Sequence, residues 1–137
     1  MKIYILDACA VIAVLNQENG AEPVKEILEQ AELKKVEIYL NKINLLEVYY
    51  DIVKRRGEKI ADNILFEIMS SAIKIIDKIS DEVLKRAGIL KSKYGISLAD
   101  AIVLAESTIK KAIVITADHH EFDSIEGKEN IEFFWIR

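Results

Sequence analysis

The chain has 137 residues, 51% of them hydrophobic and 31% charged, and its formal net charge is −4. This balance predicts a folded protein with a real core, in a single domain over residues 1–137, and argues against disorder. The negative charge excludes a protein that coats nucleic acid through bulk positive charge, but it leaves open a nucleic-acid enzyme whose acidic pocket holds metal ions.

Two further features bear on the compartment. The single cysteine, Cys9, cannot form an internal disulfide and fits a reducing environment. No signal-type segment and no apolar run of membrane-spanning length is present. We therefore expect a cytoplasmic protein with no membrane association. The short basic clusters, such as residues 54–56 and 110–111, are interpreted as solvated helix faces.

The first half of the chain begins with an apolar run at residues 3–6, which predicts a buried parallel strand ending at Asp7. A short helix follows through Leu15, and Pro23 suits the first turn of a second helix that continues to Leu33. Alternating apolar residues at 36–40 predict a second strand. Two helices are then expected, at residues 42–56 and 58–70, with Gly57 as the C-cap between them.

The second half continues the alternation of strands and helices. Strands are predicted at residues 72–76, 112–116 and 131–136, and helices begin at Ser80 and Ser97. Strands that alternate with helices predict a three-layer α/β/α sandwich around a mainly parallel sheet of about five strands. We see no internal repeat and no linker.

Four acidic residues lie where such a fold can bring them together. Asp7 ends the first strand, Asp118 ends the fourth, and Glu47 and Asp100 lie near the starts of two helices. Carboxylates gathered at one sheet edge would repel one another, which raises their pKa values or requires cations. Oxygen-only ligands suit Mg²⁺ or Mn²⁺, and no Cys/His set with zinc spacing is present.

Each of these residues also has a structural interpretation. Ser97 with Asp100 forms a passable capping box, and Asn44 with Glu47 can be interpreted in the same way. Asp7 can cap the helix that follows it. Asp118 can begin a turn. The functional hypothesis therefore depends on the combination, because two strands of one sheet end in Asp and a third Asp opens a largely buried helix.

The segments ILDACAVIAVLNQE, NLLEV, ISLADAIVLA and VITAD, with a Phe-Asp pair downstream, resemble a PIN-domain ribonuclease in order and spacing over nearly the whole chain. The small single-domain form is most similar to the VapC-type toxins of toxin–antitoxin modules. The resemblance implies a metal-dependent endoribonuclease that hydrolyses RNA and leaves 5′-phosphate and 3′-hydroxyl ends. It also implies a homodimer and a cognate antitoxin as partner.

The resemblance assigns roles to particular residues. It makes Asp7, Glu47, Asp100 and Asp118 the catalytic ligands of one or two Mg²⁺ or Mn²⁺ ions. Accessory residues are Thr116, the family's small hydroxyl residue at the last strand end, the acidic Asp123, and Ser97, which we expect to cap its helix.

The chain departs from the family pattern at Cys9, where Ser or Thr is common, and we interpret Cys9 as a packing residue. His119 and His120 are expected to be surface turn residues. An apolar groove for an antitoxin helix is plausible, involving Tyr49, Tyr50, Phe66 and Met69, although core packing is the favoured role for most of them.

Three alternatives stay open. Within the family, a nuclease of RNA processing or quality control competes with a toxin. A receiver or phosphatase-like domain also places an Asp at a strand end, but the phosphatase needs a second Asp where this chain has Cys9, and a receiver would use Asp77 as its acceptor. A catalytically silent interaction domain would use the carboxylates only as caps.

Overall fold

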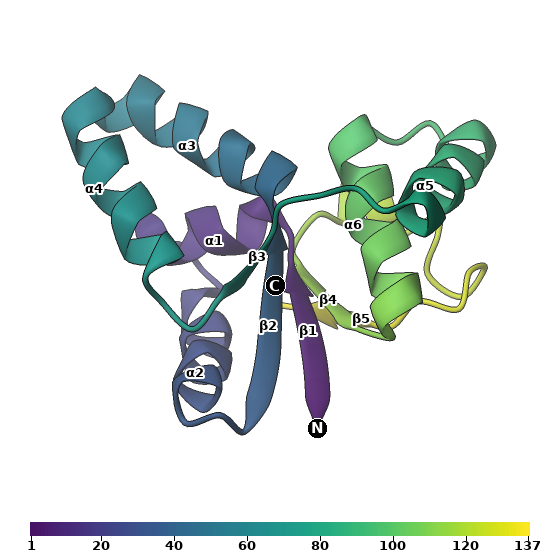
Figure 1. The fold of residues 1–137 in the computed structure, drawn as a ribbon, viewed down its shortest axis with the longest axis horizontal. Helices are drawn as coiled ribbons and strands as arrows, with labels where there is room; N and C mark the ends of the chain where they lie inside the picture. The colour runs from purple at the N-terminus through teal and green to yellow at the C-terminus, as the bar shows by residue number, and fades with distance from the viewer.

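The computed structural model describes all residues 1–137, and its centre is a five-stranded sheet with helices on both faces (Figure 1). The strands lie in the order β3-β2-β1-β4-β5, and every neighbouring pair is parallel. Their bounds are β1 (Lys2–Leu6), β2 (Val36–Asn41), β3 (Lys74–Ile76), β4 (Ile113–Thr116) and β5 (Phe133–Trp135). The predicted three-layer α/β fold with about five strands is confirmed.

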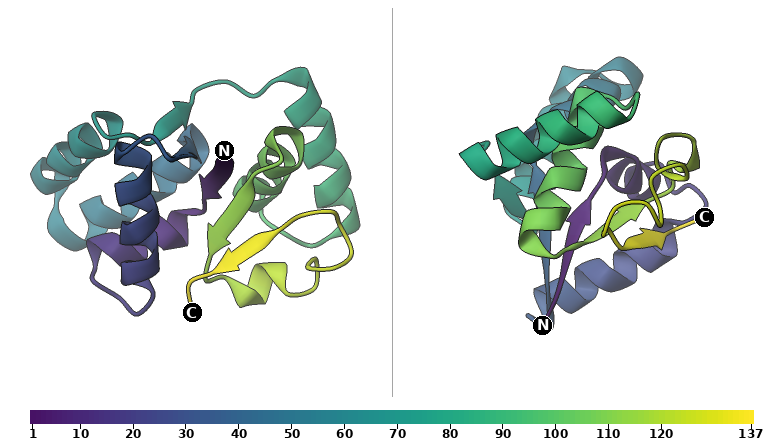
Figure 2. Two further views of the ribbon diagram at one scale, coloured as in Figure 1. Left: turned by 90° about the horizontal axis from the view of Figure 1, so that it is seen from below. Right: turned by 90° about the vertical axis from the view of Figure 1, so that its right-hand side faces the viewer.

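The helices divide into two groups, one on each side of the sheet. In Figure 1, α1 to α4 lie to the left of the strands and α5 and α6 to the right, and Figure 2 shows the same division from below. Their bounds are α1 (Ala8–Leu15), α2 (Ala21–Glu32), α3 (Lys42–Arg56), α4 (Glu58–Met69), α5 (Asp81–Lys93), α6 (Leu98–Lys110) and the short α7 (His119–Phe122). None of them combines the length and apolar character that a membrane crossing requires.

Alternate residues of each strand face the two helical layers, as the pleat requires. Tyr4 and Leu6 of β1 pack into the core formed with α1 to α4, whereas Ile5 between them packs into the core formed with α5 and α6. Ile5 and Leu6 have at most 1% of their surface exposed. A continuous apolar run is therefore required in β1, because both of its faces are covered.

The predicted element types are right, and the differences lie at the ends. Both edge strands are shorter than predicted, since β3 and β5 each pair with a single neighbour over three positions. Helix α2 begins at Ala21, so Pro23 falls in its first turn, as predicted, where its missing N–H costs no helical hydrogen bond. Helix α7 occupies a segment for which only a turn was expected.

The sheet topology singles out the carboxyl end of β1. From β1 the chain adds β2 and β3 on one side and later β4 and β5 on the other, so the strand order reverses beside β1. In open parallel sheets, ligands bind at the carboxyl edge next to such a reversal. Asp7 lies there, and its backbone N–H donates to the carbonyl of Ile115 on β4 at 3.1 Å.

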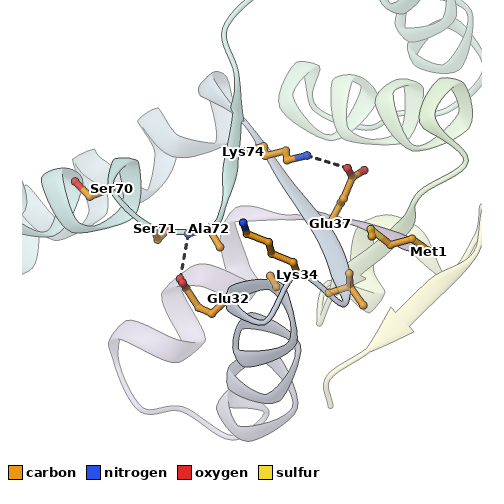
Figure 3. Close-up of a pocket in the computed structure, with 10 residues that line it drawn as sticks. Met1, Glu32, Lys34, Glu37, Ser70, Ser71, Ala72 and Lys74 are labelled. Atoms are coloured by element: carbon orange, nitrogen blue, oxygen red, sulfur yellow. Dashed lines mark hydrogen bonds and ion pairs between the residues drawn. The ribbon is translucent and has the colours of Figure 1, made fainter.

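A hollow of about 500 Å³ lies at the opposite edge, where the strands begin (Figure 3). Three of its four charged side chains, those of Glu32, Glu37 and Lys74, bind one another or the adjacent backbone. Lys74 donates to Glu37 at 2.8 Å, and the backbone N–H of Ala72 donates to Glu32 at 3.1 Å. This hollow contains no converging set of carboxylates, and Asp7 is not among the residues that line it.

Candidate metal centre

Three aspartates converge at the carboxyl edge of the sheet. Asp7 follows β1, Asp118 follows β4, and Asp100 lies in the first turn of α6. One carboxylate oxygen from each lies within 4.8 Å of the others. Asp7 and Asp100 are buried and Asp118 is half-buried. The structure thus brings together three of the four acidic residues singled out in the sequence.

The capping alternatives are resolved by the hydrogen bonds. Asp7 precedes α1, but its side chain makes no capping hydrogen bond. Ser97 caps α6, because its hydroxyl accepts from the backbone N–H of Asp100 at 3.1 Å, as predicted. Asp118 does act as a cap, accepting from the N–H of Glu121 at 3.1 Å. The carboxylates of Asp7 and Asp100 are therefore not explained by helix capping.

Thr116 links two of the aspartates. Its fully buried hydroxyl donates to Asp7 Oδ2 at 2.8 Å and accepts from the backbone N–H of Asp118 at 3.0 Å. Because the hydroxyl has one proton, these bonds fix its direction and orient the Asp7 carboxylate. The hydroxyl residue singled out in the sequence thus lies at the end of β4, in contact with the carboxylate of Asp7.

The interpretation of Cys9 as a packing residue was incomplete. Its Sγ donates to Asp7 Oδ2 at 3.4 Å and accepts from the backbone N–H of Ala117 at 3.3 Å. Helix α1 begins immediately after Asp7, so the side chain at position 9 turns back toward the end of β4. Burial, followed by the negative charge of Asp7, raises the pKa of the Cys9 thiol to about 12, which keeps it neutral.

Glu47 lies outside this group of three aspartates, but it lines the same cleft, which is described below. Asn44, one turn earlier on α3, donates from its amide to Glu47 Oε1 at 3.2 Å. Burial, and then the charge of Asp7, raise the pKa of Glu47 above its usual value. Asp7 and Glu47 line the same cleft, so their negative charges face a shared space.

The structure does not bring Asp123 into this cleft, so its prediction as an accessory acidic residue is not supported by its position. Helix α7 turns Asp123 toward His119, whose Nδ1 lies 2.7 Å from its carboxylate. That contact is exposed. His119 is likewise absent from the cleft wall, in agreement with the prediction that it is a surface residue.

The cleft has a volume of about 300 Å³, and its wall includes three residues with polar groups that were not predicted to lie at the acidic site. They are Glu121 on α7 and Tyr50 and Asp51 on α3. Tyr50 and Asp51 lie three and four residues after Glu47, so helical spacing could have placed them on its face. The wall is formed by Asp7, Ala8, Cys9, Ile12, Glu47, Tyr50, Asp51, Ser97, Asp100, Asp118 and Glu121.

The apolar groove expected on α3 and α4 is present but differs in membership. Tyr49 and Met69 line it together with Leu45, Leu46 and Leu65. Tyr50 and Phe66 do not line this groove, although both are exposed. The favoured role of core packing is wrong for Tyr50, Phe66 and Met69, because more than half of each side chain is exposed. Helix α3 turns Tyr50 toward the acidic cleft.

Of the carboxylates in the acidic cleft, Asp51 pairs with Arg55 at 3.1 Å, whereas the three converging aspartates have no cationic partner. Burial, and then the charge of Asp7, raise the pKa of Asp100 from 3.8 to about 7. Burial raises the pKa of Asp7 as well, and the nearby charge of Asp118 adds to this. No Lys or Arg side chain lines the cleft. A hard divalent cation fits this oxygen-only donor set, because it would neutralise the carboxylates and favour their ionised forms.

Comparisons with known proteins complete the description. Residues 4–128 match the PIN domain family. No curated protein sequence matches the chain. Among solved structures, DNA-bound VapBC from Salmonella typhimurium is similar over 100% of both chains, with a TM-score of 0.76 and 15% identity.

Two further solved structures share the fold. A toxin–antitoxin complex from Klebsiella pneumoniae is similar over 98% of both chains, with a TM-score of 0.71 and 21% identity. VapC20 from Mycobacterium tuberculosis, a sarcin-ricin loop cleaving toxin, covers 82% of this chain and 87% of its own, with a TM-score of 0.62 and 13% identity. At sequence identities this low, the similarity shows that the fold is shared.

Proposed function

Because the chain belongs to the PIN-domain family, we propose that it is a metal-dependent endoribonuclease whose active site is the acidic cleft. The observation that carries this proposal is the convergence of three carboxylates within 4.8 Å, in a cleft without a cationic side chain. Such a site is suited to bind divalent cations, and the bound cations can in turn bind the phosphate groups of a substrate.

Each side chain has a role in this proposal. Asp7, Asp100 and Asp118 hold one or two ions, Mg²⁺ or Mn²⁺, because all their donors are oxygens. The chemistry that a divalent ion would supply there is a more acidic water molecule and a positive charge next to the phosphodiester. Glu47 completes the ligand set or positions the water. Thr116 holds the Asp7 carboxylate in one orientation through its 2.8 Å hydrogen bond.

The rival interpretations have less support. A silent interaction domain would use the carboxylates as helix caps, but Asp7 makes no capping bond. A receiver-like domain would need Asp77 in an acidic pocket, whereas Asp77 is exposed and lies 3.6 Å from Lys42. Neither rival accounts for a raised pKa at Asp7, Glu47 and Asp100 together.

Within the nuclease proposal, a toxin role is favoured over RNA processing. The support is that solved structures of similar fold are named as VapBC, as a toxin–antitoxin complex and as a cleaving toxin. The role implies a cognate antitoxin and a homodimer. The apolar groove of about 360 Å³ between α3 and α4 offers a surface for a protein partner. A small antitoxin gene beside the gene for this chain would support the role, and its absence would favour RNA processing.

The direct test is RNA cleavage by the purified protein. The wild type, Asp7→Asn and Asp77→Asn are incubated with RNA in Mg²⁺ or Mn²⁺, and in parallel with excess EDTA. Loss of a ligand that supplies several kcal/mol should slow cleavage by Asp7→Asn about a hundredfold or more. Asp77→Asn is the matched control, because its carboxylate is exposed and outside the cleft.

Two outcomes would contradict the proposal. One is cleavage by Asp7→Asn at the wild-type rate. The other is wild-type cleavage that persists in EDTA, which would show that the activity does not need the proposed ion.

A further inference from the structure

Tyr50 is an exposed aromatic side chain in an otherwise acidic cleft. More than half of its surface, 55%, is open to solvent. It is the only aromatic residue in the cleft wall, which otherwise consists of carboxylates, small side chains and Ile12. A large ring left uncovered inside a hollow is a feature of binding sites, because burying it against a ligand is favourable.

The packing of α3 explains the direction of this ring. Leu45, Val48 and Ile52 form the buried face of the helix. Tyr50 lies on the other side, three residues after Glu47, and residues at this spacing are neighbours on a helix surface. Tyr50 and Glu47 therefore share one face of α3, about one helical turn apart, and both line the cleft.

The charges of the cleft indicate what such a ring would bind in a ribonuclease. No basic side chain lines the wall, and Arg55 next to it is paired with Asp51 at 3.1 Å, so a phosphate inside the cleft would contact only ions held by carboxylates. Inside the cleft, the bases of an RNA strand therefore offer the contact that a neutral side chain can make. Aromatic side chains bind unpaired bases by stacking, whatever the base, because every base has a π-face.

We propose that Tyr50 is a substrate-binding residue whose ring stacks on an unpaired nucleobase next to the scissile phosphodiester. This inference rests on the proposed ribonuclease function and names its substrate as a single-stranded or splayed segment of RNA. The proposed contact requires an unpaired base, because the bases of duplex RNA are stacked on each other and are not free to contact the ring.

The test compares the ring, the hydroxyl and a matched aromatic residue elsewhere. Tyr50→Phe keeps the ring, Tyr50→Leu removes it, and Phe66→Leu removes an exposed ring on α4 that lies outside the cleft. Steady-state cleavage of a single-stranded RNA oligonucleotide gives kcat and KM for each protein. We expect KM to rise about tenfold in Tyr50→Leu, with kcat within about twofold of the wild type. Tyr50→Phe and Phe66→Leu should match the wild type.

A second readout identifies the base that stacks. An abasic site is moved along the oligonucleotide one position at a time, and KM is measured with the wild type and with Tyr50→Leu. At one position beside the cut, the abasic site should raise the wild-type KM about tenfold and leave the KM of Tyr50→Leu unchanged. Thermal melting verifies that each variant is folded.

The outcomes separate this inference from the function on which it rests. If cleavage requires Asp7 but Tyr50→Leu has the wild-type KM, the ribonuclease stands and the stacking role is overturned, and the ring is then free for a protein partner. Equal losses in Tyr50→Phe and Tyr50→Leu would assign the effect to the hydroxyl and also overturn it. If the wild type cleaves no RNA, both proposals fail.

Discussion

Replacing Asp100 by asparagine should stabilise the metal-free protein at alkaline pH. The carboxylate of Asp100 is buried near Asp7, and its pKa is raised from 3.8 to about 7. The folded state therefore holds this proton more tightly than the unfolded chain does. The contribution of this bound proton to the free energy of unfolding is fully present below about pH 4 and is lost as the pH rises through 7. Asparagine has no proton to lose, so the variant escapes this loss.

The size of the effect follows from the shift. About three pKa units at 1.36 kcal/mol each give a ceiling of ~4 kcal/mol above pH 7. Because the cleft opens to water, we expect about half of this, ~2 kcal/mol. The backbone N–H of Asp100 still donates to Ser97 in the variant, so the cap of α6 is kept.

The assay is urea unfolding in EDTA at pH 4 and pH 8. Trp135 is the only tryptophan and reports unfolding by its fluorescence. Asp100→Asn should exceed the wild type by ~2 kcal/mol at pH 8 and match it at pH 4. The free energy of unfolding of Asp77→Asn, the exposed control, should stay within about 0.5 kcal/mol of the wild-type value at both pH values. An Asp100→Asn protein that is less stable than the wild type at pH 8 would refute the reasoning.

Three further substitutions or modifications test other parts of the structure. Thr116→Val removes the 2.8 Å hydrogen bond to Asp7, and we expect Mn²⁺ affinity at pH 7 to fall about tenfold by calorimetry, with Thr116→Ser restoring it. The thiol of Cys9 has a pKa of about 12, so it should react with a disulfide reagent at pH 8 about a hundredfold more slowly in the native protein than in urea. Equal rates would show that the fold does not keep the thiol buried and protonated. Gly20→Ala should lower the free energy of unfolding by about 2 kcal/mol in urea titrations. The reason is that Gly20 has φ +98° and an added Cβ would lie 2.8 Å from the carbonyl oxygen of Ile136. An unchanged free energy of unfolding would contradict this prediction.

The parts of the site that follow from sheet geometry could be predicted from the sequence. Asp7 and Asp118 each follow an apolar strand, and the carboxyl ends of parallel strands share one edge. Asp100 follows a Ser cap at the start of a buried helix, so its depth in the fold could be expected. These inferences need only the order of elements and the parallel direction of the strands.

The other parts depend on how single side chains are turned. Cys9 contacts Asp7 because α1 begins without a loop after β1, and Asp123 leaves the cleft because α7 forms where only a turn was expected. Tyr49 and Tyr50 are identical neighbours in the sequence, and only the packing of α3 turns one toward the groove and the other toward the cleft. Periodicity alone does not separate two such adjacent rings.

The central claim is that Asp7, Asp100 and Asp118 together bind a divalent cation. Calorimetric titration of Mn²⁺ or Mg²⁺ into EDTA-treated and desalted protein tests it most directly, in two buffers of different ionisation enthalpy. We predict saturable binding to the wild type, with protons released near pH 6 because Asp100 has a pKa of about 7, and no saturable binding to Asp7→Asn. Wild-type protein without a saturable site, or an Asp7→Asn protein that binds the ion as tightly as the wild type, would contradict the claim.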